Sequence, residues 1–358
     1  NASFESDIFY LKNDHIVLKD LGAPTIAVAT SETPSFNYTR SQSGFEDVNT
    51  FYHLTNFANY ITALGYSALQ DFYIEVDPHG ASGADQSFFT GGVIPTIQYG
   101  EGGVDDAEDA DVIIHEYAHA LSHQASPGSN TGFERRAADE GYGDYLAASY
   151  SRQFSDYMWG NVFNWDGHNE FWSGRQVNTT KVYPTDVVNP DIYKTGEIWS
   201  SALMDIYNIL GAEVTDKLVF ESLYGSFANM GLQDAAMLIL NAENTIYGGM
   251  YNTVLYETLN ARGLINAVPA TYSAQPDGIQ IMNTAGYTHD KTPLLIILPV
   301  AQNTIIQIYN IQGQLLMEEA IHGTDTIYFT PDLPTPGIYL LKVNGDLNGV
   351  KVQMIYSV

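Results

Sequence analysis

The sequence contains no cysteine, and only 14 of its 358 residues are lysine or arginine. The absence of cysteine excludes thiolate catalysis and zinc or iron–sulfur sites built from thiolates, and it leaves the compartment undetermined. Because 42 acidic residues give a formal net charge of −28, we expect no nucleic-acid partner and no binding to an anionic membrane surface. No run of 18 apolar residues occurs, so no membrane-spanning helix is predicted.

The composition is that of a folded protein, because hydrophobic residues make up 45% of the chain and charged residues only 16%. A chain of 358 residues exceeds one average domain, so two domains are expected. The acidic surface would also attract Ca²⁺.

Residues 1–262 change between strand and helix patterns, which predicts an α+β fold. Short strands are expected within residues 1–46, at 16–18 and 25–29, and again within residues 66–104. Apolar residues at spacings of three and four predict helices. The expected helices are 47–64, 107–123, 137–152, 195–210, 213–224, 232–246 and 249–262, with long ordered loops over 153–193.

Residues 264–292 are rich in proline and glycine without helical periodicity, which is typical of a linker. Beyond this segment the sequence alternates between apolar and polar residues in short runs. These runs predict strands at 304–309, 326–329, 337–343 and 350–355. Short strands at such spacing favour a small Ig-like β-sandwich.

The pattern His-Glu-x-x-His at residues 115–119 is the main chemical signal. On a helix, positions i and i+4 share one face, so both imidazoles can reach one ion, while Glu116 lies beside that ion. From residue frequencies the pattern arises by chance in roughly one such chain in a hundred. Two histidines on an exposed helix are the alternative. The apolar residues Ile113, Ile114 and Leu121 make an exposed helix less favoured.

A third ligand is required, because catalytic zinc has three protein ligands and one open position. Glu140, 21 residues after His119, supplies the candidate, and Asp144 follows it by one helical turn. Asp144, and also Asp139, can accept the second ring N–H of a zinc-bound histidine, which fixes its tautomer. A solvated helix carboxylate is the alternative for Asp144.

Together these motifs resemble the gluzincins, specifically the thermolysin and fungalysin families, over roughly residues 45–262. The resemblance implies a thermolysin-like fold and a zinc endopeptidase. In that mechanism Glu116 is the general base for a zinc-bound water that hydrolyses peptide bonds of polypeptide substrates. Residues 85–89, followed by Tyr-Gly-Glu-Gly at 99–102, resemble the family's edge strand, which implies that Ser87, Phe88 and Phe89 bind substrate. Asp111 matches a position that often binds structural calcium, although Ser151 stands where one of its acidic partners is expected.

The resemblance also indicates a residue that stabilises the transition state. Residues 196–201 resemble the fungalysin Gly-Glu-x-Trp-Ala helix, which a histidine precedes by three positions; this chain has Tyr193 there. A phenol donates the same hydrogen bond as a weaker, neutral donor. Arg175, upstream in the loop region, is the other candidate, and a packing role is the alternative for Tyr193.

The C-terminal segment resembles the sorting domain of bacterial cargo of type IX secretion. The resemblance rests on residues 308–314 and 333–343, and it implies a secreted or cell-surface bacterial protein whose partner is that secretion machinery. An ordinary β-sandwich that binds substrate or sugar is the alternative. We therefore expect a catalytic domain at 1–268, a linker at 269–292 and a sorting domain at 293–358.

Two other functions compete with an active endopeptidase. A zinc aminopeptidase of another gluzincin branch would carry Gly-x-Met-Glu-Asn upstream of the zinc helix, and residues 66–114 contain no such run. A catalytically weak surface adhesin or binding protein on a zincin fold is supported only by Tyr193. Disabled copies usually lose a ligand or the base, whereas all four residues are present here.

Overall fold

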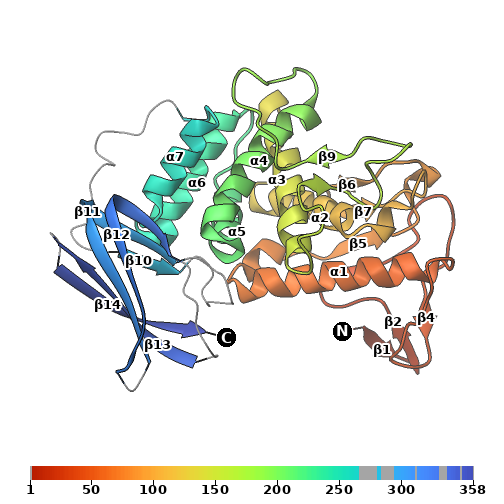
Figure 1. The fold of residues 1–358 in the computed structure, drawn as a ribbon. Coiled ribbons are helices and arrows are strands. Elements are labelled where there is room, and N and C mark those ends of the chain that lie inside the picture. Colours follow the sequence, from red (N-terminus) through yellow and green to blue (C-terminus); the bar gives the residue numbers. More distant parts are fainter. Residues whose placement is uncertain are drawn as a thin grey trace. The chain divides into compact units, whose positions relative to one another are not determined.

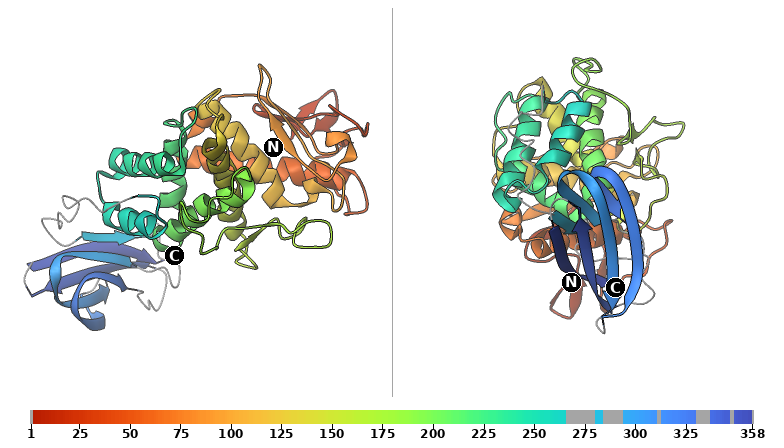
Figure 2. Two further views of the ribbon diagram at one scale, coloured as in Figure 1. Left: turned by 90° about the horizontal axis from the view of Figure 1, so that it is seen from above. Right: turned by 60° about the vertical axis from the view of Figure 1, so that its left-hand side comes forward.

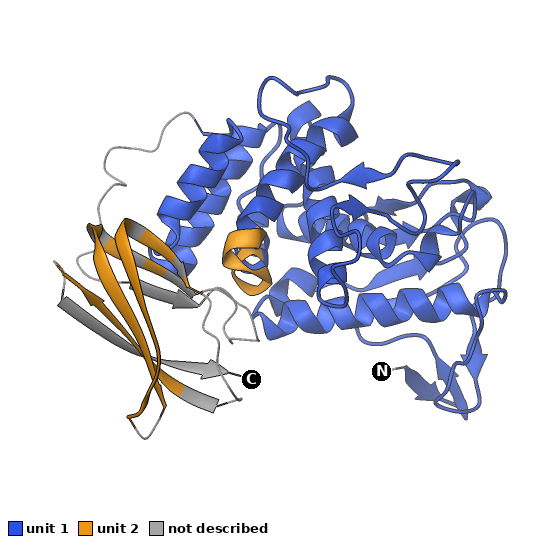
Figure 3. Cartoon of the chain, in the orientation of Figure 1, with its two compact units in different colours: residues 1–206, 216–266 blue, residues 207–215, 267–358 orange. Residues whose placement is uncertain are grey.

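The structure is a computed structural model that describes residues 2–265, 280–283, 294–310, 313–329, 337–346 and 349–357. The chain forms two compact units, which are coloured separately in Figure 3. The first comprises residues 1–206 and 216–266, and the second comprises residues 207–215 and 267–358. Helices and strands occur throughout the described residues, which confirms the α+β class.

Two small sheets form the N-terminal part of the first unit. One is antiparallel, with the order β1 (Ser3–Glu5), β2 (Ile8–Tyr10) and β4 (Thr30–Ser31). The other has the order β3 (Ile16–Leu18), β5 (Ile74–Asp77), β7 (Thr96–Gln98) and β6 (Phe88–Thr90). β3, β5 and β7 are parallel, and β6 pairs antiparallel with β7, so β6 is an edge strand. Single 3-10 turns occur at Ser67–Gln70, Ala81–Gly83 and Asp106–Glu108.

The strand predicted at 25–29 is wrong. The backbone there has no ladder partner, and the N–H of Ala29 donates instead to the carboxylate of Asp47 at 2.8 Å. Pairing with a neighbouring strand begins only at Thr30, where β4 meets β2. The β-branched residues of this run therefore favoured a strand that the surrounding structure does not provide.

All seven predicted helices are confirmed, with shifted ends. They are α1 (Gly44–Ala63), α2 (Ala110–Ala125), α3 (Phe133–Arg152), α4 (Ile192–Leu210), α5 (Ala212–Leu223), α6 (Leu232–Tyr247) and α7 (Asn252–Ala261). The predicted loop 153–193 contains only the short pair β8 (Asn161–Val162) and β9 (Arg175–Gln176) before α4 begins.

The two helices of the metal motif begin at different residues than predicted. α2 begins at Ala110 rather than 107, because Asp109 caps it and accepts the N–H of Asp111 at 2.8 Å. α3 begins at Phe133 rather than 137, because buried Arg135 pairs with Asp139 one turn later at 2.7 Å. The charged residues 134–136 interrupt the apolar periodicity, so the sequence pattern does not indicate this extra turn.

The helices α2 and α3 lie between the N-terminal sheets and the later helices, as both Figure 1 and Figure 2 show. α1 packs against β3 and α2. It does so through Phe51, Leu54, Phe57 and Ile61, which recur every three or four residues and are buried. The metal motif is therefore carried by the two helices at the centre of the first unit.

The described strands of the second unit form one antiparallel sheet. They are β10 (Gln280–Asn283), β11 (Leu294–Asn310), β12 (Leu315–Phe329), β13 (Gly337–Gly345) and β14 (Gly349–Ser357). β11 pairs with β12 on one side, and with β10 and then β13 on the other. The predicted strands at 304–309, 326–329, 337–343 and 350–355 are confirmed. Inward residues of β11, β12 and β13 build a separate core. That core includes Ile306, Ile308, Leu341 and Val343.

Two parts of the C-terminal prediction lie outside the described residues. The linker 269–292 is described only where it forms β10. Residues 311–312 and 333–336 of the sorting motif are not among the described residues.

Candidate metal centre

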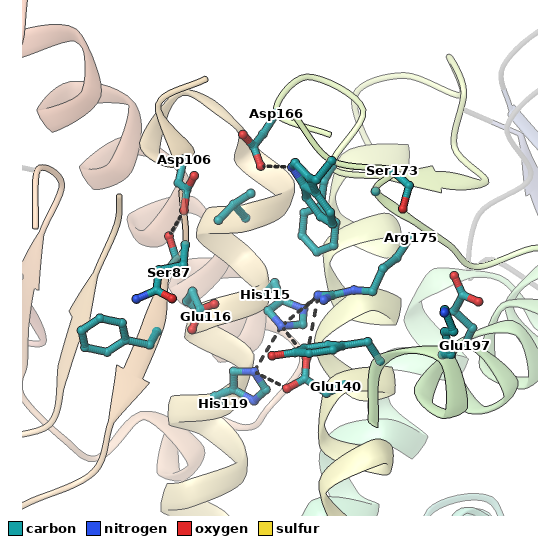
Figure 4. Close-up of a pocket in the computed structure, with 18 of the residues that line it drawn as sticks. Ser87, Asp106, His115, Glu116, His119, Glu140, Asp166, Ser173, Arg175 and Glu197 are labelled. Atoms are coloured by element: carbon teal, nitrogen blue, oxygen red, sulfur yellow. Dashed lines mark hydrogen bonds and ion pairs between the residues drawn. The ribbon is translucent and has the colours of Figure 1, made fainter. Parts of the chain in front are cut away.

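α2 and α3 bring the two histidines and Glu140 to one point, where Figure 4 shows their side chains converging. The Nε2 atoms of His115 and His119 are 3.2 Å apart. Oxygens of Glu140 lie 3.3 Å from Nε2 of His115 and 3.9 Å from Nε2 of His119. One potential ligand atom from each of the three residues lies within 4.8 Å of the others. Such a His₂Glu group suits a catalytic zinc site.

Glycine allows α3 to approach the zinc helix closely. A Cβ added at Gly143 would lie 2.5 Å from Nδ1 of His115, so no other residue fits without displacing the imidazole. Glycine in a helix interior costs roughly 1 kcal/mol relative to alanine. Gly143 thus lets α3 approach closely enough to place Glu140 beside His115, although a glycine at this position destabilises the helix.

Carboxylates stand behind both histidines, at the positions that the sequence predicted for Asp144 and Asp139. Nδ1 of His115 lies 3.0 Å from Asp144, and Nδ1 of His119 lies 2.7 Å from Asp139. Asp139 also accepts hydrogen bonds from Ser122, from Asn130 and from buried Arg135. If Nδ1–H of each imidazole donates to its carboxylate, Nε2 remains free to bind a metal.

The electrostatics of the site follow from burial and these contacts. Burial alone would raise the pKa of Glu140, but a hydrogen bond from His115 and the charges of His119, His115 and Arg175 lower it to about 2. Burial would lower the pKa of His119, but the bond to Asp139 and nearby carboxylates raise it to about 10. Glu140 is therefore held as a carboxylate, which is the form that binds a metal.

Glu116 lies next to this group on α2, with only 7% of its surface exposed. Its Oε2 is buried without a hydrogen-bond partner. Burial raises the pKa of Glu116, although the nearby charges of His119 and His115 oppose that rise. A buried carboxylate without a partner, with a raised pKa, is the arrangement expected of a proton acceptor.

Arg175 and Tyr193 both reach the same cavity. The guanidinium of Arg175 lies 2.8 Å from Asp144 and 3.8 Å from Glu140. Its central carbon lies over the ring of Tyr193, 5.0 Å from the ring centre. Tyr193 lies in the first turn of α4 and is 50% exposed, so it is not a core residue. The charge of Glu140, followed by burial, raises the pKa of its phenol.

A cavity of about 790 Å³ contains this site. Ser87, Phe88 and Phe89 form one wall, on and just before the edge strand β6. The resemblance placed the substrate strand at these residues, and the structure brings them to the same cavity as His115 and Glu116.

Asp111, the predicted calcium residue, has different partners. Its carboxylate accepts hydrogen bonds from the hydroxyl of Ser151 and from the N–H of Phe163, the latter at 2.9 Å. Asp111 belongs to none of the groups of three potential ligands among the described residues. A calcium ion at Asp111 is therefore not supported.

Among the residues around the ligands that the sequence did not predict, three are in close contact with the metal motif. Phe163 packs edge-on against His115 at 5.5 Å, and Asn130 donates to Asp139. Gly143 is the third. Its signal was present, since two glycines between Glu140 and Asp144 are unusual within a helix. Phe163 and Asn130 lie in loops, where no periodicity indicates which side chains turn toward a site.

No described helix combines the length and apolarity needed to span a membrane.

Three comparisons with known proteins each find a metallopeptidase. The model of the fungalysin metallopeptidase family (M36) matches residues 44–267. An extracellular metalloproteinase, MEP, from Fusarium vanettenii is 24% identical over 200 residues, which cover 45% of this chain and 31% of that protein. The chain thus spans about a third of that relative's length. The precursor of protealysin, a metalloproteinase from Serratia proteamaculans, has a similar fold, with a TM-score of 0.55 at 12% identity over 70% of this chain and 87% of that one.

Proposed function

Because the chain belongs to the fungalysin metallopeptidase family, we propose that it is a zinc-dependent endopeptidase that hydrolyses polypeptides. The observation that carries this proposal is the convergence of His115, His119 and Glu140 within 4.8 Å, beside Glu116 in one cavity. The resemblance noted in the sequence covers all four residues, including the third ligand.

The residues fit a zinc ion. Oε2 of Glu140 is buried 3.3 Å from Nε2 of His115 without a well-aligned hydrogen bond, and its charge is costly there unless a cation compensates it. Two imidazole nitrogens and one carboxylate are a donor set that zinc prefers, with one position left open. When bound, the ion would supply a Lewis acid for the scissile carbonyl and lower the pKa of a water toward about 7.

Glu116 is the proposed general base. Its position next to the ligands lets it accept a proton from the attacking water and later return that proton to the leaving amine. Its buried, unpartnered oxygen is suited to both steps, because no competing hydrogen bond has to be broken first.

Tyr193 and Arg175 are the proposed donors to the oxyanion. Both line the cavity, and Arg175 is fixed by Asp144 at 2.8 Å. Half of the Tyr193 side chain is exposed, so its phenol is open to a bound substrate. A donor aimed at the developing negative charge lowers the barrier without stabilising the bound substrate.

The edge strand β6 is the proposed substrate-binding strand. An extended peptide can add to a sheet edge through backbone hydrogen bonds, which give affinity with little demand on sequence. Ser87, Phe88 and Phe89 lie on the cavity wall, so such a peptide would pass Glu116.

We propose that the C-terminal residues form a sorting domain with an Ig-like sandwich fold. This domain would direct a bacterial protein through type IX secretion to the cell surface or the medium. Support comes from the alternating strands β11 to β14 and the separate core. We also retain the proposed boundaries of a catalytic domain at 1–268, a linker at 269–292 and a sorting domain at 293–358.

The test is hydrolysis of casein by the purified chain, with and without 1,10-phenanthroline. We expect the chelator to abolish cleavage and added zinc to restore it, with about one zinc per chain by elemental analysis. Undiminished cleavage by metal-free protein would rule out the zinc mechanism. Zinc-loaded protein that cleaves nothing would instead support the binding-protein alternative.

A further inference from the structure

A second group of carboxylates lies in the wall of the same cavity, apart from the zinc ligands. Asp85 precedes β6, Asp106 lies in the 3-10 turn before α2, and Asp166 lies in the loop after β8. One oxygen from each lies within 4.8 Å of the others. Figure 4 shows Asp106 and Asp166 near one another, on the side of the pocket away from Glu140.

Two of these carboxylates are buried and only half satisfied. Asp106 and Asp166 are each 3% exposed. Oδ2 of Asp106 accepts the hydroxyl of Ser87, and Oδ2 of Asp166 accepts the indole N–H of Trp172 at 2.9 Å. The remaining Oδ1 of each is buried without any hydrogen-bond partner. Such an atom costs free energy unless something absent from the chain itself binds it.

The charge of the group is also uncompensated. Burial raises the pKa of Asp106 to about 8, and the negative charges of Asp166 and Asp85 add to this rise. The hydrogen bond from Ser87 opposes the rise without cancelling it. Burial, with the charges of Asp109 and Asp85, raises the pKa of Asp166 to about 7. Among the described residues, no lysine, arginine or histidine forms an ion pair with Asp85, Asp106 or Asp166.

We propose that Asp85, Asp106 and Asp166 form a binding site for a hard divalent cation, Ca²⁺, in the wall of the substrate cavity. An all-oxygen donor set selects Ca²⁺ or Mg²⁺ over zinc. Ca²⁺ is favoured because it accepts irregular coordination and fills its shell with water, whereas Mg²⁺ requires a near-ideal octahedron. Three carboxylates around a divalent cation have one net negative charge. For such a site we expect a dissociation constant of about 10⁻⁵–10⁻⁴ M.

The cation would connect three segments of the cavity wall. Asp85 leads into the edge strand, and Asp106 leads into the zinc helix through Asp109. Asp166 lies in the loop between β8 and β9, which carries Phe163 and ends at Arg175. None of these contacts depends on the zinc ligands. The site is therefore distinct from the proposed catalytic centre, and its occupancy does not require activity.

The first experiment titrates the zinc-loaded full chain with CaCl₂ by calorimetry, in about 0.15 M KCl to screen the acidic surface. We expect one saturable site with a dissociation constant of about 10⁻⁵–10⁻⁴ M, and a rise of a few degrees in the unfolding midpoint at millimolar Ca²⁺. A weaker response to Mg²⁺ is expected. No saturable binding at 10-fold above that range overturns the proposal, as does a site that prefers Mg²⁺.

Conservative variants locate the ion. Asp106→Asn and Asp166→Asn should each weaken Ca²⁺ binding at least about tenfold, because each removes one charged ligand. The matched control is Asp105→Asn, in the neighbouring group Glu46, Asp105 and Glu108, where Glu108 is already bonded to Arg40 and Trp165. Calcium binding that is lost in Asp105→Asn, or retained in both cavity variants, overturns the assignment and indicates adventitious binding to the acidic surface.

Terbium gives a second measurement that does not depend on variants of the ligands. Tb³⁺ in the calcium site would be sensitised by Trp172, whose indole contacts Asp166. We expect emission that CaCl₂ displaces, that Trp172→Phe diminishes, and that Glu140→Gln leaves unchanged. Emission that follows Glu140 rather than Trp172 would place the ion at the zinc ligands and refute the second site. A failure of the zinc proposal alone would leave the terbium signal intact.

Discussion

Two groups of buried carboxylates lie in or directly beside one cavity, and their charges are compensated in different ways. Glu140 and Asp139 contact histidines, and Asp139 also contacts Arg135, so the pKa of each is lowered despite burial. Asp106 and Asp166 have neutral donors, chiefly the hydroxyl of Ser87 and the indole N–H of Trp172, and the pKa of each is raised. Burial is common to both groups, so the partners decide which carboxylates stay ionised.

The difference separates two kinds of metal site. Around His115 and His119 the chain itself supplies bases and orienting carboxylates, so the site is arranged before any ion arrives. Around Asp106 the chain supplies negative charge alone, and a cation or protons must balance it. We therefore expect changes in the first group to alter turnover, and changes in the second to alter cation binding and stability.

The largest effect is expected for Glu116→Gln. Glutamine keeps the size and the hydrogen-bonding atoms but cannot accept a proton, so kcat should fall by about 10²–10⁴ while zinc content stays unchanged. Casein cleavage and zinc analysis on the same sample measure this. His119→Ala is the contrasting variant, because it should lose the metal. Near-normal turnover of the glutamine variant would show that Glu116 is not the base.

Tyr193→Phe should give the next largest effect. The change removes one oxygen from a half-exposed side chain, so packing is nearly unchanged, while loss of one oxyanion donor typically costs about 10²–10³ in kcat. The loss should appear in kcat more than in KM, because the bond forms in the transition state. Steady-state kinetics on a peptide substrate separate the two constants. An unchanged kcat would move the role to Arg175.

The sequence indicated the residues of the first group partly through local spacing and partly through the family resemblance. The spacing of His115 and His119, and of Glu140 and Asp144, depends only on the helical repeat. Helices and C-terminal strands were likewise found from periodicity. Their ends were less accurate where capping decided them, as Asp109 does for α2.

The second group could not be predicted, because Asp85, Asp106 and Asp166 lie far apart in sequence and on irregular segments. No spacing rule connects a residue before a strand, one in a 3-10 turn and one in a loop. The strand wrongly predicted at 25–29 failed for a related reason, since pairing depends on a partner that local sequence does not specify.

A buried carboxylate outside the cavity tests how far neutral donors can compensate charge. Asp216 is 1% exposed and accepts hydrogen bonds from the hydroxyls of Tyr60, Tyr145 and Ser149. Burial outweighs all three donors and raises its pKa from 3.8 to about 6. Because the folded pKa is the higher one, the folded state binds more protons, so stability is greatest below about pH 4 and falls as the pH rises to about 6.

Asp216→Asn should remove this dependence, which is worth on the order of 2–3 kcal/mol across that window. Urea unfolding from pH 4 to 7 measures it, and fluorescence reports on the first unit because all four tryptophans lie there. Tyr60→Phe is the control, since loss of one donor should raise the pKa further and extend the fall to higher pH. Parallel pH curves for wild type and Asp216→Asn would contradict the raised pKa.

Asp144→Asn should have the smallest effect. It tests whether His115 needs the negative charge of this carboxylate or only a hydrogen-bond acceptor of the same shape. In the wild-type chain Nδ1 of His115 lies 3.0 Å from the carboxylate of Asp144. Asparagine can still accept the hydrogen bond from Nδ1–H, but it lacks the negative charge that makes Nε2 more basic. Zinc affinity should fall by about 10–100-fold, as measured by competition with a chelator of known affinity. Arg175 loses its 2.8 Å partner but keeps Glu140 at 3.8 Å, so the fold should survive, which circular dichroism checks. Calcium affinity should not change, because the proposed cation ligands do not include Asp144. A variant that loses both metals together would mean that the two carboxylate groups act as one site, and the comparison between them would fail.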